Sequence, residues 1–305
     1  MRQYVITIKR HALLLCGLLM LTFIIGMAIF GPSLSFIDEN LEEVTHTLTD
    51  GQLEVAPFPP SREHVMGTDR DGRDILSLIV MGASQTLLIV CLVTVIRYLV
   101  AIPLAYMAHK RVFGIDTLVK SLNHFLSYVP TIIIVVILAM LPPIIVSDAR
   151  PFALVIIIAL VEAGRAAHTM KLDFNAVAEK EFMLSGAAVG ASSLRMLKAY
   201  YLPFLYQKLI IYVVSDLGKV MFLLGQLGFI GVFVSQELVQ VEIGMFELRN
   251  ESITWPMLLM DTFMDLRGPV WIIFWPACVM TVTIFTFNMI AQGLQQLPKK
   301  RDSFM

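Results

Sequence analysis

The charged residues Arg97, Asp216 and Lys219 lie within long apolar runs of this chain. Asp216 and Lys219 are three residues apart, so on a helix they lie on the same face. A charge is costly in hydrocarbon, and such residues usually pair inside a helix bundle or line a path for a solute. We expect Arg97 or Lys219 to pair with Asp216 in the inner half of the bundle. The alternative is that Lys219 extends to the membrane surface and the pair only neutralises itself.

No catalytic or metal-binding motif accompanies these charges. The sequence contains neither H-E-x-x-H nor a G-x-S-x-G elbow, and no glycine-rich loop ends in Lys-Ser or Lys-Thr. The three cysteines, Cys16, Cys91 and Cys278, lie in separate apolar runs without C-x-x-C spacing, which indicates buried packing residues. We therefore predict that the chain is not an enzyme, with no catalytic residue, no bound cofactor and no metal site.

The composition indicates a membrane protein. The 305 residues are 57% hydrophobic and 15% charged, with a formal net charge of −1. Soluble domains contain about 45–50% apolar and about 25% charged residues. The difference excludes a soluble two-domain protein, a disordered chain and a disulfide scaffold. Because no basic patch is present, the expected partner is the lipid bilayer and no nucleic acid.

The elements that must position the three charges are transmembrane helices. A helix needs about 20 apolar residues to cross a bilayer, and its backbone amides must be satisfied within the span. Six runs qualify, which predicts an all-α membrane protein with six transmembrane helices. The predicted spans are Ala12–Phe30, Thr86–Ala108, Leu118–Leu141, Phe152–Ala167, Leu209–Phe233 and Val270–Leu294.

The basic residues predict the orientation of these spans. Of the 23 lysines and arginines, 15 fall on the side of the N-terminus, six on the other side and two within spans. Basic residues favour the cytoplasmic side, so we expect both termini there. The first span is longer than the apolar region of a signal peptide and lacks a small-residue cleavage site, which favours a retained anchor.

This topology divides the chain into three parts. Residues 1–85 contain the anchor helix (12–30) and an extracytoplasmic loop, residues 86–295 form the transmembrane domain, and residues 296–305 form a cytoplasmic tail. A cytoplasmic loop, residues 168–208, interrupts the transmembrane domain.

The cytoplasmic loop has a helix, glycine turn, helix pattern. Small residues at 185–188 and 190–193 allow another surface to approach the backbone, and Gly190 permits a bend with positive φ. Pro203 predicts a kink before the fifth span. From these residues alone, a docking element and an amphipathic connector are equally compatible with the pattern.

This loop resembles the EAA loop of ABC importer permeases, in which a glycine follows the E-A-A triplet and Leu-Pro follows the glycine. Gly190, Leu202 and Pro203 match that spacing, whereas Leu184-Ser185-Gly186 replaces the triplet. The resemblance implies coupling helices over 182–199 that dock on an ATPase. The residues that it assigns to this contact are Glu181, Leu184, Ser185, Gly186, Ala187, Gly190, Ser193, Arg195 and Pro203.

A second stretch, Gly67–Ser77, resembles the G-T-D-x-x-G-R-D-x-L-S signature of the dipeptide, oligopeptide and nickel group of these permeases. The signature residues are Gly67, Thr68, Asp69, Gly72, Arg73 and Asp74. We favour a structural interpretation in which the charges pair locally and hold a short interfacial helix that Gly72 leads into. Contact with a binding protein is the functional alternative. The likeness continues to the C-terminus and includes Thr254–Leu258.

The resemblance implies a MetI-like permease fold with cytoplasmic coupling helices, of the C-type subunit. It implies a bacterial cytoplasmic membrane location and the import of oligopeptides or dipeptides, with ATP and Mg²⁺ held by partner subunits. The implied partners are a second homologous permease, two cytoplasmic ATPase subunits and an extracytoplasmic substrate-binding protein. Import of nickel or metal chelates, a non-transporting scaffold or sensor, and a secondary transporter are the alternatives. The last would show internal repeats, and none is visible in the sequence.

Overall fold

The computed structural model describes residues 2–297, apart from residues 50, 51, 146, 148, 189, 233, 235, 243, 244, 251 and 261–267. Within this part of the chain, five helices are long and apolar enough to cross a membrane. They are α1 (Arg2–Phe30), α2 (Ile75–His109), α6 (Arg150–Ala178), α9 (Leu202–Phe229) and α11 (Trp271–Gln295). The chain is therefore a multi-pass, mainly α-helical membrane protein, as its composition predicts.

The predicted third span is not one straight helix. Residues 118–141 divide between α3 (Ile115–Tyr128) and α4 (Thr131–Ala139), which meet at an angle of 98°. Val129 and Pro130 are both extended, with ψ of 122° and 132°. The proline ring disfavours a helical conformation at Val129, and Pro130 lacks the N–H that would continue α3. The predicted six spans agree with the structure if this bent pair is counted as one span. A continuous helix over 118–141 was wrong, because that prediction treated Pro130 as part of an unbroken apolar run.

Four other helices differ in their bounds from the predicted spans. α2 begins at Ile75, eleven residues before Thr86, because the carboxylate of Asp74 accepts a bond from the Ser77 N–H and caps the helix. α1 begins at Arg2, α6 continues to Ala178, and α9 runs from Leu202 to Phe229. Residue 233, the predicted end of the fifth span, lies outside the described residues. The sixth span agrees with α11 within one residue at each end.

The longer α6 and α9 shorten the cytoplasmic loop predicted as 168–208. The connection between them contains α7 (Glu181–Ala188), α8 (Ser193–Arg195) and the π-helical turn η3 (Met196–Tyr201). The predicted tail, residues 296–305, lies outside the described part except for residues 296 and 297. The other short helical turns among the described residues are η1 (Gly31–Ser33), η2 (Val112–Gly114), α5 (Pro142–Ile145) and η4 (Met257–Leu259).

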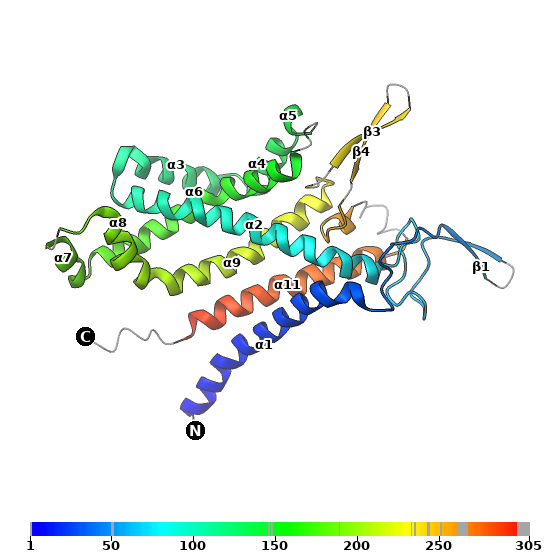
Figure 1. Cartoon of the computed structure of the whole chain (residues 1–305), viewed down its shortest axis with the longest axis horizontal. Helices are drawn as coiled ribbons and strands as arrows, with labels where there is room; N and C mark the ends of the chain where they lie inside the picture. Colours follow the sequence, from blue (N-terminus) through cyan, green and yellow to red (C-terminus); the bar gives the residue numbers. More distant parts are fainter. Residues whose placement is uncertain are drawn as a thin grey trace.

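The long helices form a bundle whose two ends differ. α2 packs most extensively on α6, and α11 packs between α1 and α9. The start of α1 and the end of α11 lie toward the same end as α7 and α8, while both β-hairpins lie at the opposite end (Figure 1). Antiparallel hairpins β1–β2 (His46–Thr49, Gln52–Val55) and β3–β4 (Gln236–Glu242, Met245–Asn250) were not predicted from the sequence.

The buried residues form two apolar clusters, one toward each end of the bundle. The hairpin-end cluster includes Ile79, Val90, Ile158 and Leu224. The cluster at the α7–α8 end includes Tyr106, Phe174, Met183, Tyr201 and Leu205. Both clusters contain residues of α2, α6 and α9. These three helices therefore position the side chains between the two clusters.

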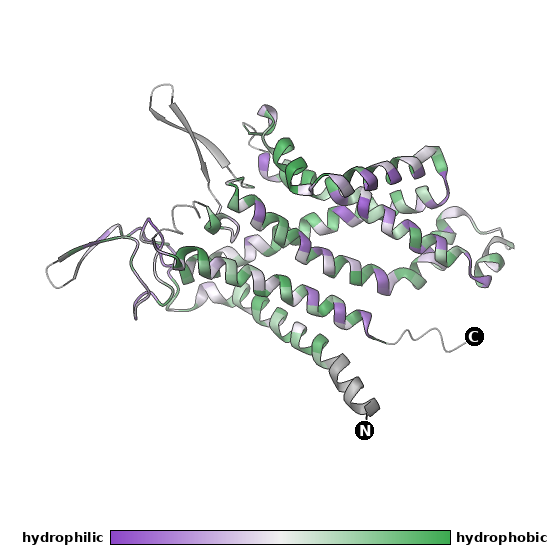
Figure 2. Cartoon of the chain, turned by 180° about the vertical axis from the view of Figure 1, so that it is seen from behind, coloured by the Kyte–Doolittle hydropathy of each residue, from purple (hydrophilic) through white to green (hydrophobic). Residues whose placement is uncertain are grey.

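The outer faces of the helices are apolar. Leu19, Phe23, Leu99 and Phe285 are each more than 60% exposed, and hydrophobic residues run along α1 in Figure 2. A bilayer satisfies such faces, whereas water does not. Cys16 and Cys91 are also exposed. The interpretation of all three cysteines as buried packing residues was therefore wrong for these two.

Candidate functional site: the midspan charges and the coupling segment

Arg97 and Asp216 form a buried ion pair between α2 and α9. Arg97 Nη1 donates to Asp216 Oδ2 over 2.7 Å, and the two side chains are 3% and 8% exposed. Arg97 Nη2 and Nε also donate to the carbonyl oxygens of Ile158 and Ala159 on α6, at 2.9 and 3.4 Å. These bonds satisfy the guanidinium in a low-dielectric interior and join three helices at one point.

Lys219 takes a different position from Arg97. Its Nζ lies 3.4 Å from Asp216 Oδ1, yet 72% of its side chain is exposed. Of the two predicted partners of Asp216, Arg97 therefore makes the close buried contact, and Lys219 makes a longer contact from the surface.

Lys219 lines a cavity of about 140 Å³ on the exposed side of α2, α6 and α9, which we call the midspan cavity. Eight of its nine lining residues carry a polar or charged side chain. The residues that line it are Tyr98, Glu162, Arg165, Ala166, Thr169, Tyr212, Ser215, Asp216 and Lys219. Arg165 thus lies within the long helix α6.

Glu162 and Arg165 connect this cavity to the break between α3 and α4. Arg165 Nη1 donates to Glu162 Oε1 at 3.1 Å, and Arg165 Nη2 donates to the carbonyl oxygen of Leu126 near the end of α3. The hydroxyl of Thr131, the first residue of α4, donates to the Glu162 carboxylate. An interrupted helix leaves backbone groups without partners in a bilayer, and Arg165 supplies a donor for one of them, the Leu126 carbonyl oxygen.

The coupling segment, defined as Glu181–Tyr201, has the predicted helix, turn, helix form. α7 carries Glu181, Leu184, Ser185, Gly186 and Ala187. Gly190 has a φ of +71°, which favours glycine because a Cβ there meets the following carbonyl oxygen. Ser193 and Arg195 lie on α8, whose N-cap, Ser192, accepts a bond from the Arg195 N–H.

Two leucines stand out from this segment. Leu184 on α7 is 73% exposed and Leu194 on α8 is 60% exposed. Other side chains hold the two helices together, since Gly186 lies against the ring of Tyr200 and Phe182 stacks on Phe204 with centroids 4.1 Å apart. Pro203 is the second residue of α9 and follows the π-helical η3 directly, so a π-helical turn stands where a proline kink was predicted.

Hydrogen bonds join the coupling segment to α2 and α6. Tyr106 Oη donates to the carbonyl oxygen of Ser193 at 2.7 Å. Tyr201 Oη donates to His109 Nε2 at 2.9 Å, and His109 Nδ1 donates to Asn175 Oδ1 at 2.6 Å. The rings of Tyr106, Phe174 and Tyr201 pack edge to face. The coupling segment is therefore joined by side-chain hydrogen bonds to α2 and, through His109, to α6.

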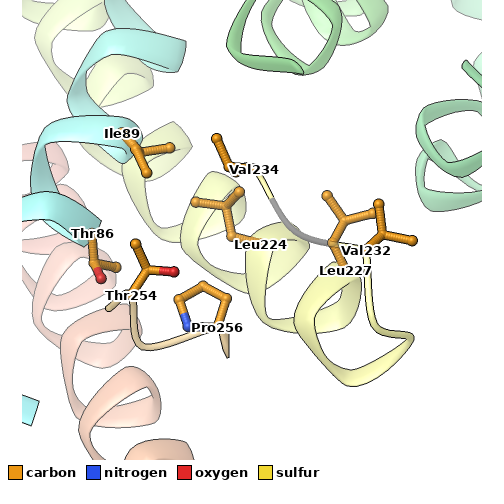
Figure 3. A pocket seen from close by; sticks show the side chains of 8 residues that line it. All are labelled: Thr86, Ile89, Leu224, Leu227, Val232, Val234, Thr254 and Pro256. Carbon is orange, nitrogen blue, oxygen red and sulfur yellow. The ribbon is translucent and has the colours of Figure 1, made fainter. Parts of the chain in front are cut away.

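At the opposite end of the bundle, the segment around Trp255 inserts between α2 and α9. Trp255 is fully buried, with its backbone N–H donating to Thr86 Oγ1 at 3.0 Å and its Nε1 donating to the Ile79 carbonyl oxygen at 2.8 Å. Figure 3 shows Thr254 and Pro256 beside Leu224 and Leu227 of α9. The Pro256 carbonyl oxygen would lie 1.9 Å from a Cβ at position 228, so only glycine fits at that point of α9.

The six signature residues form a compact loop just before α2. Arg73 pairs with Asp69 and Asp71, each at 2.8 Å, and Asp69 Oδ1 accepts the N–H groups of residues 71 and 73. Gly72 has a φ of +82° and lies against the Val44 carbonyl oxygen. The charges thus pair locally, but the helix that follows is α2 itself. The predicted separate interfacial helix was wrong.

The other signature residues fix this loop to its neighbours. Thr68 Oγ1 accepts the N–H of Phe58 at 2.7 Å, and the Thr68 carbonyl oxygen accepts from Trp271 Nε1 at 3.2 Å. Gly67, with a φ of +78°, lies against the Trp271 ring. Burial raises the pKa of the Asp69 carboxyl, and the nearby Arg73 offsets this effect only in part.

Several residues of the site were missed by sequence reasoning. Glu162 and Arg165 are three apart in an apolar run, the same signal that identified Asp216 and Lys219. Tyr106 and His109 carried no local motif, because their partners are 87 and 92 residues away. No cluster of three or more metal-ligating side chains occurs among the described residues.

The chain is similar to curated bacterial permeases along most of its length. It is 24% identical to the dipeptide transport system permease protein DppC of Bacillus subtilis over 298 residues, which cover 96% of this chain and 84% of the relative. It is 23% identical to the oligopeptide transport system permease protein OppC of the same species, covering 96% of this chain and 88% of that one. A probable D,D-dipeptide permease, DdpC of Escherichia coli, is 22% identical over 291 residues, which cover 95% and 88%. No family model matches the chain.

Proposed function

We infer that this chain, which belongs to the dipeptide and oligopeptide group of ABC importer permeases, is the transmembrane permease subunit of an ATP-driven peptide importer. The observation that carries this proposal is the similarity to peptide permeases along 96% of the chain. The names of these relatives favour peptides over the nickel chelates that the sequence alone leaves open. The exposed leucines of α7 and α8 support the proposal, because a subunit without its own ATPase motif needs a docking surface for one.

In the proposed assembly, this chain forms half of the translocation pore beside a second homologous permease. Two ATPase subunits bind ATP and Mg²⁺ on the cytoplasmic side, and a substrate-binding protein delivers peptide on the other side. The coupling segment docks on one ATPase, so both termini are cytoplasmic, because α7 and α8 lie toward the same end of the bundle as the start of α1 (Figure 1). The membrane is the bacterial cytoplasmic membrane.

In the proposed mechanism, displacement of the coupling segment moves the helices of the bundle. Closure of the ATPase pair displaces α7 and α8, and the bonds from Ser193 to Tyr106 and from Tyr201 to His109 carry the movement into α2. α2, α6 and α9 are joined by the Arg97–Asp216 pair and move together. The ATPase-docking segment and the translocation path thereby favour one or the other of two conformations of the same helices. Such a shared two-state element is the physical requirement for coupling.

Co-purification with the ATPase tests the docking assignment. We expect Leu184→Glu combined with Leu194→Glu to abolish ATPase capture in detergent, since each places a charge on an exposed apolar docking residue. Leu53→Glu is the matched control, because Leu53 is 62% exposed on β2 at the opposite end. Retained ATPase binding in the double variant, with normal membrane insertion, would refute the assignment. Lost capture in both variants would indicate general damage, and Gly190→Pro then provides a separate disruption of the same segment.

A further inference from the structure

Lys219 places an ammonium group deep within a membrane span. α9 has 28 residues, and Lys219 lies ten residues before its end at Phe229. At a rise of about 1.5 Å per residue, the Cα is about 15 Å from the nearer end of the helix. A lysine at that depth is strongly disfavoured against acyl chains and usually faces a bundle interior or a water-filled path. Since 72% of this side chain is exposed, something other than lipid must cover it in the membrane.

The surroundings of Lys219 indicate water and solute. It lines the midspan cavity of about 140 Å³ together with the hydroxyl-bearing residues Tyr98 and Ser215. The other exposed faces of the same helices carry large apolar side chains, such as Leu99 on α2 and Phe222 on α9. The polar concavity is therefore a localised feature of this face, and its position on three packed helices places it beside the break between α3 and α4.

The charges around the cavity do not cancel. Arg97 pairs with Asp216, and Arg165 pairs with Glu162. Lys219 is the fifth charge and approaches only an oxygen of the carboxylate that Arg97 already neutralises. Within the described residues that surround the cavity, one positive charge is thus in excess. An anionic group that enters the cavity therefore meets a cation whose charge the neighbouring carboxylates do not cancel.

We propose that the midspan cavity is part of the wall of the translocation path and that Lys219 binds the carboxylate of the passing peptide. This proposal rests on the proposed function, because it identifies the solute as the zwitterionic peptide of that function. The cavity favours the carboxylate end over the amino end, since the surplus charge is positive. The hydroxyl groups of Tyr98 and Ser215 are the neutral donors that line the same space.

Thiol accessibility in the assembled importer tests the first half of the proposal. Lys219→Cys is made in a chain whose three native cysteines are replaced by alanine, and the rate of modification by a charged, water-soluble thiosulfonate is measured. Phe285→Cys is the control, because Phe285 is 61% exposed at the middle of α11 and does not line the cavity. We expect the cysteine at position 219 to react at least ten-fold faster than that at 285, and dialanine with the binding protein to slow it. The proposal would be overturned if the cysteines at positions 219 and 285 reacted at equal, negligible rates. It would also be overturned if the cysteine at position 219 stayed unreactive both with and without dialanine. The latter result would mean that the second permease covers Lys219.

Peptide uptake into proteoliposomes tests the role of the charge. We expect Lys219→Gln to lower dialanine uptake about ten-fold, the effect of losing one charged hydrogen bond, and Lys219→Arg to retain most of it. ATPase capture verifies that both variants assemble. If the wild-type chain imports dialanine and Lys219→Gln imports it equally well, the carboxylate assignment is wrong while the proposed function stands. If the wild-type chain imports no peptide, the proposed function itself fails, and the accessibility result still reports whether the cavity is aqueous.

Discussion

Arg97 and Asp216 lie 119 residues apart in the sequence and 2.7 Å apart in the structure, at the boundary between the two apolar clusters of the bundle. On α2, the hairpin-end cluster reaches Val93 and the other cluster begins at Tyr98. The pair therefore fixes the relative register of α2 and α9 at a point where neither cluster does. Because burying a charge is costly, each member of the pair is stable only in the presence of the other.

The first prediction concerns this mutual dependence. Asp216→Leu leaves a buried guanidinium without its carboxylate and should destabilise the chain by about 3–5 kcal/mol, lowering its Tm in detergent. Arg97→Met combined with Asp216→Leu should recover most of that loss, because it removes both charges at once. The measurement is thermal unfolding of the two single variants and the double variant. Additive losses in the double variant would show that the pair is not an energetic unit.

The second prediction concerns the Trp255 segment. Gly228→Ala places a methyl group on the Pro256 carbonyl oxygen and should displace the segment, lowering Tm by several degrees. Gly225→Ala, one turn earlier on α9, is the matched control because its methyl meets only the flexible end of Met280. We expect the control to unfold within about 0.5 kcal/mol of the wild type. Equal Tm values for the two variants would contradict the close packing of Pro256 on α9.

The third prediction concerns transmission from the coupling segment. Tyr106→Phe and Tyr201→Phe each remove one hydroxyl bond to or from this segment while keeping the aromatic packing. We expect ATPase capture to remain, with peptide uptake per ATP hydrolysed falling several-fold in the double variant. Tyr206→Phe is the control, since Tyr206 is 60% exposed on α9. An unchanged transport-to-hydrolysis ratio in the double variant would show that these bonds do not transmit the movement.

The fourth prediction concerns pH. Burial raises the pKa of Asp69, so the folded chain holds this proton to a higher pH than the unfolded chain, where the pKa is about 4. The contribution of this carboxyl to stability is thus most favourable below about pH 4 and is lost as the pH rises through the raised folded pKa. Asp69→Asn lacks this titration. We expect the Tm of the variant minus that of the wild type to increase between about pH 4 and pH 7. A difference that is constant or decreases would contradict the raised pKa.

The lengths of the apolar runs, and the prolines at their ends, predicted the transmembrane helices. The sixth span was placed within one residue because Pro269 and Pro298 flank its apolar run. The start of α2 was missed because its first turns contain Ser77, Ser84 and Gln85, which are polar in the sequence. Ser77 lies against Asp74 and Asp38 in the fold, and this arrangement is invisible to a hydropathy argument. The break at Pro130 could have been predicted from the proline itself. It was overlooked because apolar residues continue on both sides of it.

The two hairpins and the site differ in how predictable they were. The Asp50-Gly51 dipeptide between two alternating stretches is a common hairpin signal and was available in the sequence. The charged residues of α2 and α9 could be identified because a charge in a bilayer is energetically costly. This cost does not determine whether Arg97 or Lys219 pairs with Asp216. The choice of Arg97 over Lys219 depends on the packing of α2 on α6, where two carbonyl oxygens accept the rest of the guanidinium.

The most direct test of the account is ATP-driven peptide uptake by the reconstituted importer. This chain is combined in proteoliposomes with the proposed second permease, ATPases and binding protein, and uptake of radiolabelled dialanine is followed. We predict accumulation that requires ATP and is lost when this chain is omitted or carries the Leu184→Glu and Leu194→Glu substitutions. Accumulation that proceeds without this chain, or its absence in a complete assembly that hydrolyses ATP, would contradict the assignment of the chain as a peptide permease.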